Sequence, residues 1–133
     1  MDLLQEAAVK DTVDVILKRP GTDIVIENDD GTPMTVTLYG PYSKTYRSAT
    51  IANRNKYLSM LKGDQLDAEQ ADEMMFDLLV KCIAAWDITA GGEKPKLTEK
   101  KARDILEKLP TIKDQLSLAL NNIEGFLGNS ETT

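Results

Sequence analysis

Four acidic side chains form the most regular set of potentially reactive groups in the sequence. They recur every three or four residues, and no basic residue between Gly63 and Val80 offsets them. On a helix this spacing places the carboxylates on one face. A metal site would need further ligands from a second helix, and nothing in the sequence marks them. We therefore predict no metal site here, and interpret the row as a solvated face or as a docking surface for a basic partner. Its members are Glu69, Asp72, Glu73 and Asp77.

Histidine is absent from the 133 residues, so the commonest general base and metal ligand is missing. Every Ser-His or Cys-His mechanism is thereby excluded. The single cysteine, Cys82, lies on the apolar face of its expected helix, which favours a buried structural thiol over a nucleophile. We expect no catalytic residue and no cofactor, and a protein that is not an enzyme.

Two glycine-containing segments match ligand-binding loops only in part. Residues 28–31 (Asn-Asp-Asp-Gly) fit the middle of a calcium loop, but Ile26 and Thr37 would occupy the first and twelfth positions, where carboxylates are needed. Residues 91–92 (Gly-Gly) lack the Gly-Lys-Ser/Thr that follows in a phosphate-binding loop. The first segment predicts a hairpin turn and the second a flexible loop.

Trp86 is the only tryptophan in the sequence. We expect it at a helix end as a core anchor, with a partner-binding hot spot as the alternative. A basic cluster follows it, but a single nearby aromatic residue does not make a platform for nucleic acid. The cluster comprises Lys94, Lys96, Lys100 and Lys101.

The charge balance argues against nucleic acid or an anionic membrane as the main partner, because 16 basic and 22 acidic residues give a net charge of -6. The longest apolar run, near residues 78–86, is interrupted by Lys81 and is far shorter than the roughly 20 residues that cross a bilayer. Asp2, Glu6 and Asp11 make the first residues unlike a signal peptide. One cysteine provides no internal disulfide, so we expect a reducing cytosol.

Helical periodicity dominates the second half of the chain. Asp67 and Gln70 have the form of a capping box, Ser43 and Thr98 can each cap a helix, and Pro110 interrupts one. The predicted helices span residues 44–61, 67–86, 98–109 and 111–127. Gly125 and Gly128 are candidate helix stops, followed by a flexible tail at 128–133.

Apolar residues at helical spacing define the expected core faces. For the second helix the face comprises Ala71, Met75, Leu78, Leu79, Cys82 and Trp86. For the last helix it comprises Ile112, Leu116, Ala119, Leu120, Ile123 and Leu127. The first helix has a less apolar stripe, and the third is short.

Alternating residues predict a β-hairpin at 22–39, with Ile24 and Ile26 on one strand and the aliphatic residues of 34–38 on the other. Thr35 and Thr37 should face solvent. Residues 1–17 could form a short helix and then an extended segment. Together these elements predict a mainly α (α+β) single domain over residues 1–133, in which an N-terminal hairpin packs on a bundle of about four helices at 44–127.

The order of several motifs resembles the tail assembly chaperones of long-tailed bacteriophages, the siphophages and myophages. The resemblance covers roughly residues 15–127, and the ordered set is more specific than any one piece. The motifs are Tyr39-Gly40-Pro41-Tyr42-Ser43-x-x-Tyr46-Arg47, Cys82-x-x-x-Trp86-Asp87-Ile88, Leu97-Thr98-x-x-x-Ala102-x-x-Ile105-Leu106, Leu109-Pro110-x-Ile112-x-x-Gln115-Leu116 and Phe126-Leu127.

This resemblance implies a non-enzymatic protein that binds the tape-measure protein, keeps its apolar helices soluble and helps to recruit tail-tube subunits. It implies a location in the cytoplasm of the bacterial host and absence from the mature virion. The acidic row and Trp86 are the candidate partner-binding residues, and self-association is possible. The alternatives are a structural tail or head-tail connector protein and a helix-turn-helix regulator at 97–120, whose second helix has too little basic charge for a DNA groove.

Overall fold

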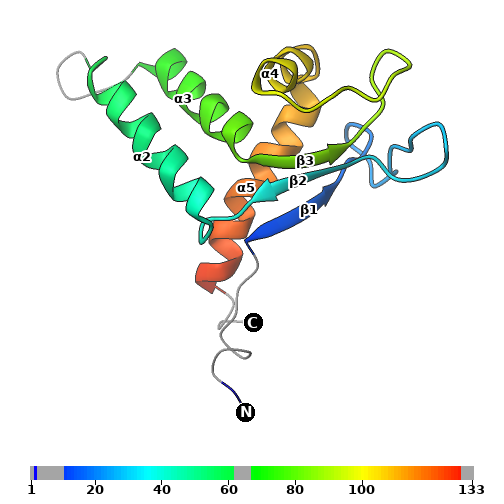
Figure 1. Ribbon diagram of the computed structural model, residues 1–133, viewed down its shortest axis with the longest axis horizontal. Helices are drawn as coiled ribbons and strands as arrows, with labels where there is room; N and C mark the ends of the chain where they lie inside the picture. The colour runs from blue at the N-terminus through cyan, green and yellow to red at the C-terminus, as the bar shows by residue number, and fades with distance from the viewer. Residues whose placement is uncertain (1, 3–10, 62–66, 130–133) are drawn as a thin grey trace.

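The computed structural model describes residues 2, 11–61 and 67–129, with side chains described as far as residue 122. This part of the chain contains four helices and one three-stranded antiparallel sheet, so the predicted α+β class is confirmed (Figure 1). The strands are β1 (Thr12–Ile16), β2 (Thr35–Tyr39) and β3 (Ile83–Asp87). The helices are α2 (Lys44–Leu58), α3 (Ala68–Lys81), α4 (Glu99–Lys108) and α5 (Pro110–Asn129).

The predicted helix starts are confirmed by their caps. The Ser43 side chain accepts a hydrogen bond from the backbone N–H of Tyr46, and Thr98 caps α4 in the same way. Asp67 and Gln70 form a complete capping box at the start of α3. Each cap satisfies backbone donors that a helix start otherwise leaves without partners. Pro110 is the first residue of α5, where a missing N–H costs little.

The strand β2 lies in the middle of the sheet, antiparallel to β1 on one side and to β3 on the other. Successive side chains of β2 point to opposite faces of the sheet. Val36 and Leu38 are buried, while Thr35 and Thr37 are partly exposed, as predicted. Thr37 donates a hydrogen bond of 2.6 Å to Asp14 on β1. The apolar face of the sheet therefore points to the helices.

The predicted hairpin is confirmed at its turn and at the adjoining bridge between Glu27 and Pro33, but its extended ladder is wrong. The N–H of Gly31 donates to the carbonyl of Asn28, and the glycine has a φ of 87°, a conformation that side chains rarely adopt. The ladder partner of β2 is β1, however, whereas residues 22–27 contribute only isolated bridges. In the observed ladder Val13 and Val15 lie opposite Leu38 and Val36, whereas Ile24 lies outside it and is 54% exposed.

The predicted second helix, residues 67–86, is also too long. The helix that forms is α3, which ends at Lys81, and the segment through Trp86 forms β3. The residues Ile-Ala-Ala-Trp carry no helix-breaking signal, so local propensity does not mark the change. The open edge of β2 supplies backbone hydrogen-bond partners, and this tertiary pairing overrides the helical pattern. Met75 is 41% exposed in the resulting helix, and Phe76 occupies the core in its place.

The last helix continues through both glycines to Asn129, so neither Gly125 nor Gly128 ends it. The extended segment expected before residue 17 is β1. The short helix expected in the first residues, and the tail from 130 to 133, lie outside the described residues.

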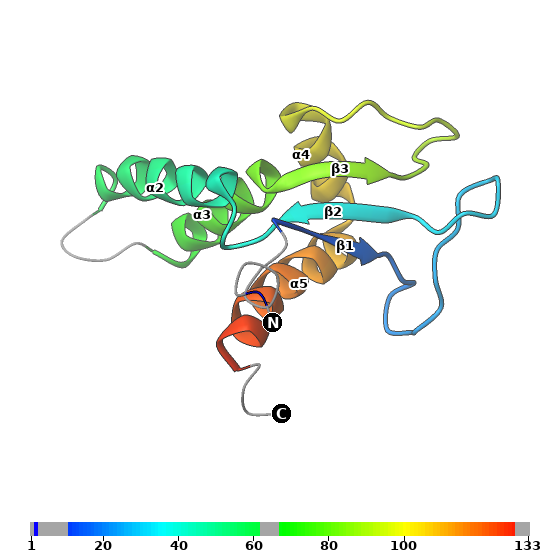
Figure 2. The same cartoon turned by 60° about the horizontal axis from the view of Figure 1, so that its bottom comes forward.

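The main core lies between the apolar face of the sheet and the helices α3, α4 and α5. Figures 1 and 2 show α5 crossing one face of the sheet, while α2 and α3 extend together to one side. A second, smaller cluster of Ala49, Leu78 and Cys82 joins α2 to α3. The sheet, α3, α4 and α5 thus share the main core, and α2 packs on α3; we call the α2–α3 pair the arm.

Candidate binding pocket

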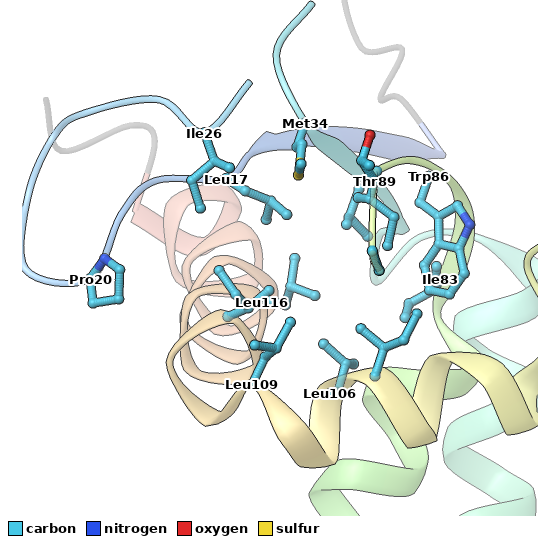
Figure 3. Close-up of a pocket in the computed structure, with 15 residues that line it drawn as sticks. Leu17, Pro20, Ile26, Met34, Ile83, Trp86, Thr89, Leu106, Leu109 and Leu116 are labelled. Carbon is cyan, nitrogen blue, oxygen red and sulfur yellow. The ribbon is translucent and has the colours of Figure 1, made fainter. Parts of the chain in front are cut away.

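An apolar pocket of about 270 Å³ lies between the sheet, α4 and α5 (Figure 3). Among its fifteen lining residues only Thr89 carries a polar side chain. The others are Leu17, Pro20, Ile26, Met34, Val36, Ile83, Trp86, Ile88, Ala90, Ile105, Leu106, Leu109, Ile112 and Leu116. Pro20 and Leu109 line the pocket and are exposed to solvent, so they form part of its rim.

One wall of the pocket is fixed by a closed ring of three backbone hydrogen bonds. Leu17 donates to Met34, Met34 donates to Ile26, and Ile26 donates to Leu17, at 2.9, 2.8 and 2.9 Å. All three side chains line the pocket. The ring satisfies the backbone groups of these three segments where the regular ladder between β1 and β2 has ended.

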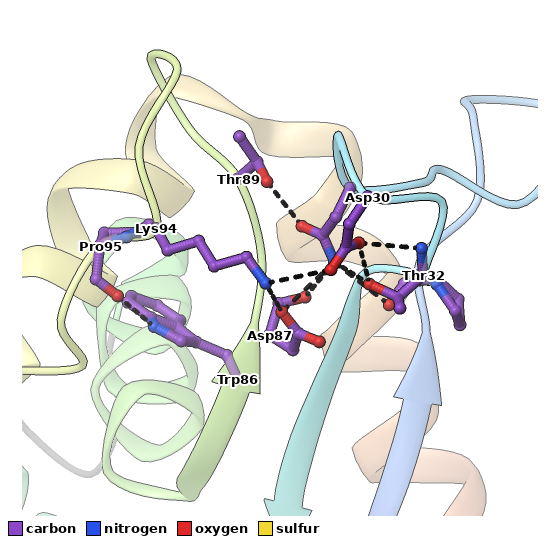
Figure 4. A network of polar contacts seen from close by, with 9 residues as sticks. Asp30, Thr32, Trp86, Asp87, Thr89, Lys94 and Pro95 are labelled. Atoms are coloured by element: carbon purple, nitrogen blue, oxygen red, sulfur yellow. Dashed lines mark hydrogen bonds and ion pairs between the residues drawn. The ribbon is translucent and has the colours of Figure 1, made fainter.

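The opposite wall contains Trp86 on β3, which is held by a polar network at the sheet end (Figure 4). The indole Nε1–H donates to the carbonyl of Pro95 at 2.8 Å. Next to it, the Lys94 ammonium lies 3.0 Å from Asp87, and this hydrogen bond raises the pKa of Lys94. These contacts join the 88–97 loop to β3 and fix the indole ring against the pocket.

The buried amide of Asn28 connects the 28–31 turn to the same strand. Its Nδ2 donates to the backbone carbonyl and the side chain of Asp87 at 3.4 and 3.3 Å, and its Oδ1 accepts from Thr89 at 2.7 Å. Asp30 accepts from the Thr32 backbone and side chain, which lowers the pKa of the Asp30 carboxyl. Residues 28–31 thus form a structural turn, as predicted, and Asn28 is its link to β3.

The pocket has a clear chemical preference. The pocket is open to solvent at its rim, and a group bound in it would remove the apolar walls from water. Water gains little there, because a buried water needs two to four polar partners. The lining contains no charged or nucleophilic side chain. The pocket is therefore suited to an apolar side chain or a small apolar molecule.

The structure divides the predicted acidic row into two parts. Asp77 is buried, and its carboxylate accepts hydrogen bonds from Tyr57 at 2.8 Å and Lys56 at 3.2 Å and forms an ion pair with Arg103. Placing Asp77 on a solvated face was therefore wrong. The signal was not local, because its basic partners come from α2 and α4 rather than from α3.

The remaining members of the row are exposed. Arg103 also pairs with Glu73 at 2.7 Å, while Glu69 and Asp72 have no ion pair among the described residues. The row does not converge with Trp86, which lines the pocket on β3. Partner binding by Glu69, Asp72 and Glu73 stays a prediction.

Cys82 is fully buried, as predicted. Burial raises the pKa of its thiol to about 11, so the thiolate is scarce at neutral pH. Within the described ranges, no group of three or more acidic or cysteine side chains could hold a metal ion. No helix in that part of the chain is long and apolar enough to cross a membrane.

Sequence reasoning identified Trp86 but missed most of the pocket. Leu106, Ile112 and Leu116 were expected only as core residues, and residues 17–26 were assigned to a hairpin or a turn. The unusual run Leu109-Pro110 was one available signal, because the short α4–α5 junction holds two apolar helix faces apart.

Comparisons with protein families, with curated proteins and with solved structures find no match to this chain.

Proposed function

We propose that this protein is a binding chaperone whose apolar pocket receives a side chain from an apolar segment of its client. The observation that supports this is the pocket itself, which has an almost wholly apolar lining and an exposed apolar rim at Pro20 and Leu109. Burial of a large aliphatic or aromatic side chain contributes about 1.5–3 kcal/mol. One pocket of this kind gives a modest, reversible contact, which suits a client that must later be released.

The proposed client is the tape-measure protein of a long-tailed bacteriophage, and the proposed role is tail assembly. This part of the proposal rests on the ordered motifs that resemble tail assembly chaperones. Three of those motifs contribute to the pocket. They supply Trp86 and Ile88, Ile105 and Leu106, and Leu109, Ile112 and Leu116, respectively. The net charge of -6 would help to keep the complex soluble while the chaperone holds apolar helices and helps to recruit tail-tube subunits.

Co-expression with the tape-measure protein of the same phage tests this function. The chaperone should raise the soluble fraction of the tape-measure protein and copurify with it. Leu109→Arg places a charge at the pocket rim and should abolish both effects. A matched control is Tyr42→Arg, which changes a similarly exposed apolar residue, 55% against 43% exposed, outside the pocket.

The outcomes separate the competing functions. Equal client solubility with wild type, Leu109→Arg and no chaperone would overturn the proposal. Mass spectrometry of purified particles provides a second test, because a structural tail or connector protein remains in the virion whereas a chaperone does not.

A further inference from the structure

The α2–α3 arm carries a second apolar surface, separate from the pocket. A groove of about 200 Å³ runs between the two helices. It is lined by Thr50, Asn53, Arg54, Tyr57, Leu58, Leu61, Met74, Met75 and Leu78. Leu58 and Met75 are 56% and 41% exposed there, and Ile51 and Met60 add further exposed apolar surface on the same arm. Several exposed apolar side chains gathered on one helix pair are typical of an interaction surface.

Two oxygen atoms in the groove have no donor. Asn53 is only 4% exposed, and its Nδ2 donates to the carbonyl of Met74 at 2.7 Å. Its Oδ1 and the Thr50 Oγ1 are buried and have no hydrogen-bond partner in the described part of the chain. Buried polar atoms normally have partners, so the contact between α2 and α3 is incompletely satisfied within the single chain, at two atoms that are themselves closed to solvent.

The charges of the two helices indicate which kind of surface fits the arm. The α2 sequence contains four basic residues and no acidic one, namely Lys44, Arg47, Arg54 and Lys56. The α3 sequence contains four acidic residues and one basic residue. Lys56 and Asp77 already pair within the arm, but Arg54 and Asp72 are exposed and form no ion pair with other described residues.

We propose that the α2–α3 arm is a self-association surface, on which α2 of each copy lies along α3 of a second copy. A two-fold axis parallel to the helices produces this arrangement and uses the same patch on both copies. It places basic α2 on acidic α3 twice, whereas α2 on α2 would place like charges together. It also brings the exposed Arg54 guanidinium of each copy to the interface, where the exposed Asp72 carboxylate of the other copy can accept its hydrogen bonds. This inference does not depend on the proposed client.

The size of the arm determines the expected affinity of self-association. Helices of 15 and 14 residues are about 22 Å long, and side by side they present a footprint of roughly 450 Å² per copy. Interfaces of this size belong to the weak, exchanging class. The full chain should therefore show a monomer–dimer equilibrium in the micromolar range or weaker.

Sedimentation equilibrium with paired charge reversals tests the proposal. Arg54→Glu and Asp72→Arg should each weaken self-association by about tenfold or more, because each sets like charges opposite one another twice. An equimolar mixture of the two variants should restore dimerisation, since both contacts then join opposite charges. Lys100→Glu, an equivalent charge change on α4, should leave the equilibrium unchanged.

Several results would overturn the proposal. They are a wild-type chain that stays monomeric up to millimolar concentration, reversals that have no effect, or a mixture that fails to restore the dimer while circular dichroism shows both variants folded. A monomeric wild type whose client binding is lost in Arg54→Glu would assign the groove to another protein instead.

Discussion

The side-chain amide of Gln115 on α5 binds both backbone polar groups of Lys18. The Lys18 N–H donates to Gln115 Oε1 at 2.9 Å, and Gln115 Nε2 donates to the Lys18 carbonyl at 2.6 Å. These two residues are 97 positions apart. Lys18 directly follows the pocket residue Leu17, and Gln115 directly precedes the pocket residue Leu116. The amide thus takes the place of a neighbouring strand just beyond β1 and joins the sheet to α5 beside the pocket.

Replacing this amide should cost a modest amount of stability. Gln115→Ala removes two hydrogen bonds at a site that solvent can reach, so we expect a loss of about 1–2 kcal/mol. Gln115→Glu retains the acceptor for Lys18 N–H but loses the donor, and should be nearly as destabilising as alanine. Urea denaturation measures both. A glutamate variant as stable as wild type would show that the second hydrogen bond contributes nothing.

The two predicted core leucines, Leu116 and Leu78, are both buried, but in different places. Leu116 has no exposed surface and lies in the main core beside the pocket, whereas Leu78 is 9% exposed and lies in the small cluster of the arm. Leu116→Ala should cost about 3–5 kcal/mol, and Leu78→Ala about 2–3 kcal/mol, since the arm can relax more easily. Thermal unfolding provides the comparison. A larger loss for Leu78→Ala would mean that the arm is the more tightly packed part.

The helix caps and the leucine stripes were predictable because their signals are local. Ser43, Asp67 and Thr98 each precede a periodic segment, and a cap acts within one turn. The strand β3 was not predictable in this way, because residues 83–87 become a strand only where β2 offers an open edge. Pairing of β1 with β2 depends likewise on burial across the sheet rather than on the nearest turn signal.

The candidate site was less predictable than the fold. A pocket is a volume that packing leaves between elements, so its residues look like ordinary core residues in the sequence. The acidic row was visible in the sequence, but its environment was not. Its spacing indicates that the carboxylates share one helix face, and it does not indicate which of them contact cations from other helices. Asp77 and Asp72 occupy the same helix with the same charge, yet only Asp77 is buried among Tyr57, Lys56 and Arg103.

That difference predicts unequal effects of matched substitutions. Asp77→Ala leaves the buried Tyr57 hydroxyl without its acceptor and removes one partner from the partly exposed Arg103, and should cost about 1.5–3 kcal/mol. Asp72→Ala changes an exposed carboxylate on the same helix and should alter stability by less than about 0.5 kcal/mol. Denaturation midpoints test the pair. Similar small losses in both variants would contradict a structural role for Asp77.

The buried thiol predicts a decline of stability in alkali. Burial raises the pKa of Cys82 from 9.0 to about 11, so the folded state holds this proton more tightly than the unfolded chain. The contribution of the protonated thiol to the free energy of unfolding is fully present below about pH 9. It is lost as the pH rises to about 11, and the two-unit shift in pKa limits this loss to about 3 kcal/mol. Burial also raises the pKa of Tyr57, which acts in the same direction.

Urea denaturation between pH 8 and 10.5 measures this loss, and Cys82→Ala separates the thiol from the other groups. The variant should start less stable but lose less stability over the range, because the thiol part is removed while those of Tyr57 and Lys94 remain. A thiol reagent should also label Cys82 far faster in urea than in the folded protein. Parallel pH curves for wild type and Cys82→Ala would show that the thiol does not contribute.

Filling the pocket should change stability and binding in opposite directions. Ala90 lines the pocket and is half-buried, so Ala90→Leu places additional apolar atoms into the open volume. Each buried methylene contributes about 0.8 kcal/mol, which predicts a gain of about 1–2 kcal/mol in the free energy of unfolding. The same atoms occupy space that a ligand would need. Binding of the apolar dye anilinonaphthalene sulfonate should therefore weaken by about tenfold, equivalent to about 1.4 kcal/mol.

The only tryptophan provides the readout, because Trp86 lines the pocket and can transfer excitation energy to a bound dye. Ala52→Leu makes the same substitution on the exposed surface of α2, outside the pocket, and should leave both stability and dye binding nearly unchanged. A general loss of packing would lower stability and raise dye binding together. Dye binding that is equal in wild type and Ala90→Leu, despite a more stable fold, would show that apolar ligands bind elsewhere and that the pocket does not receive them.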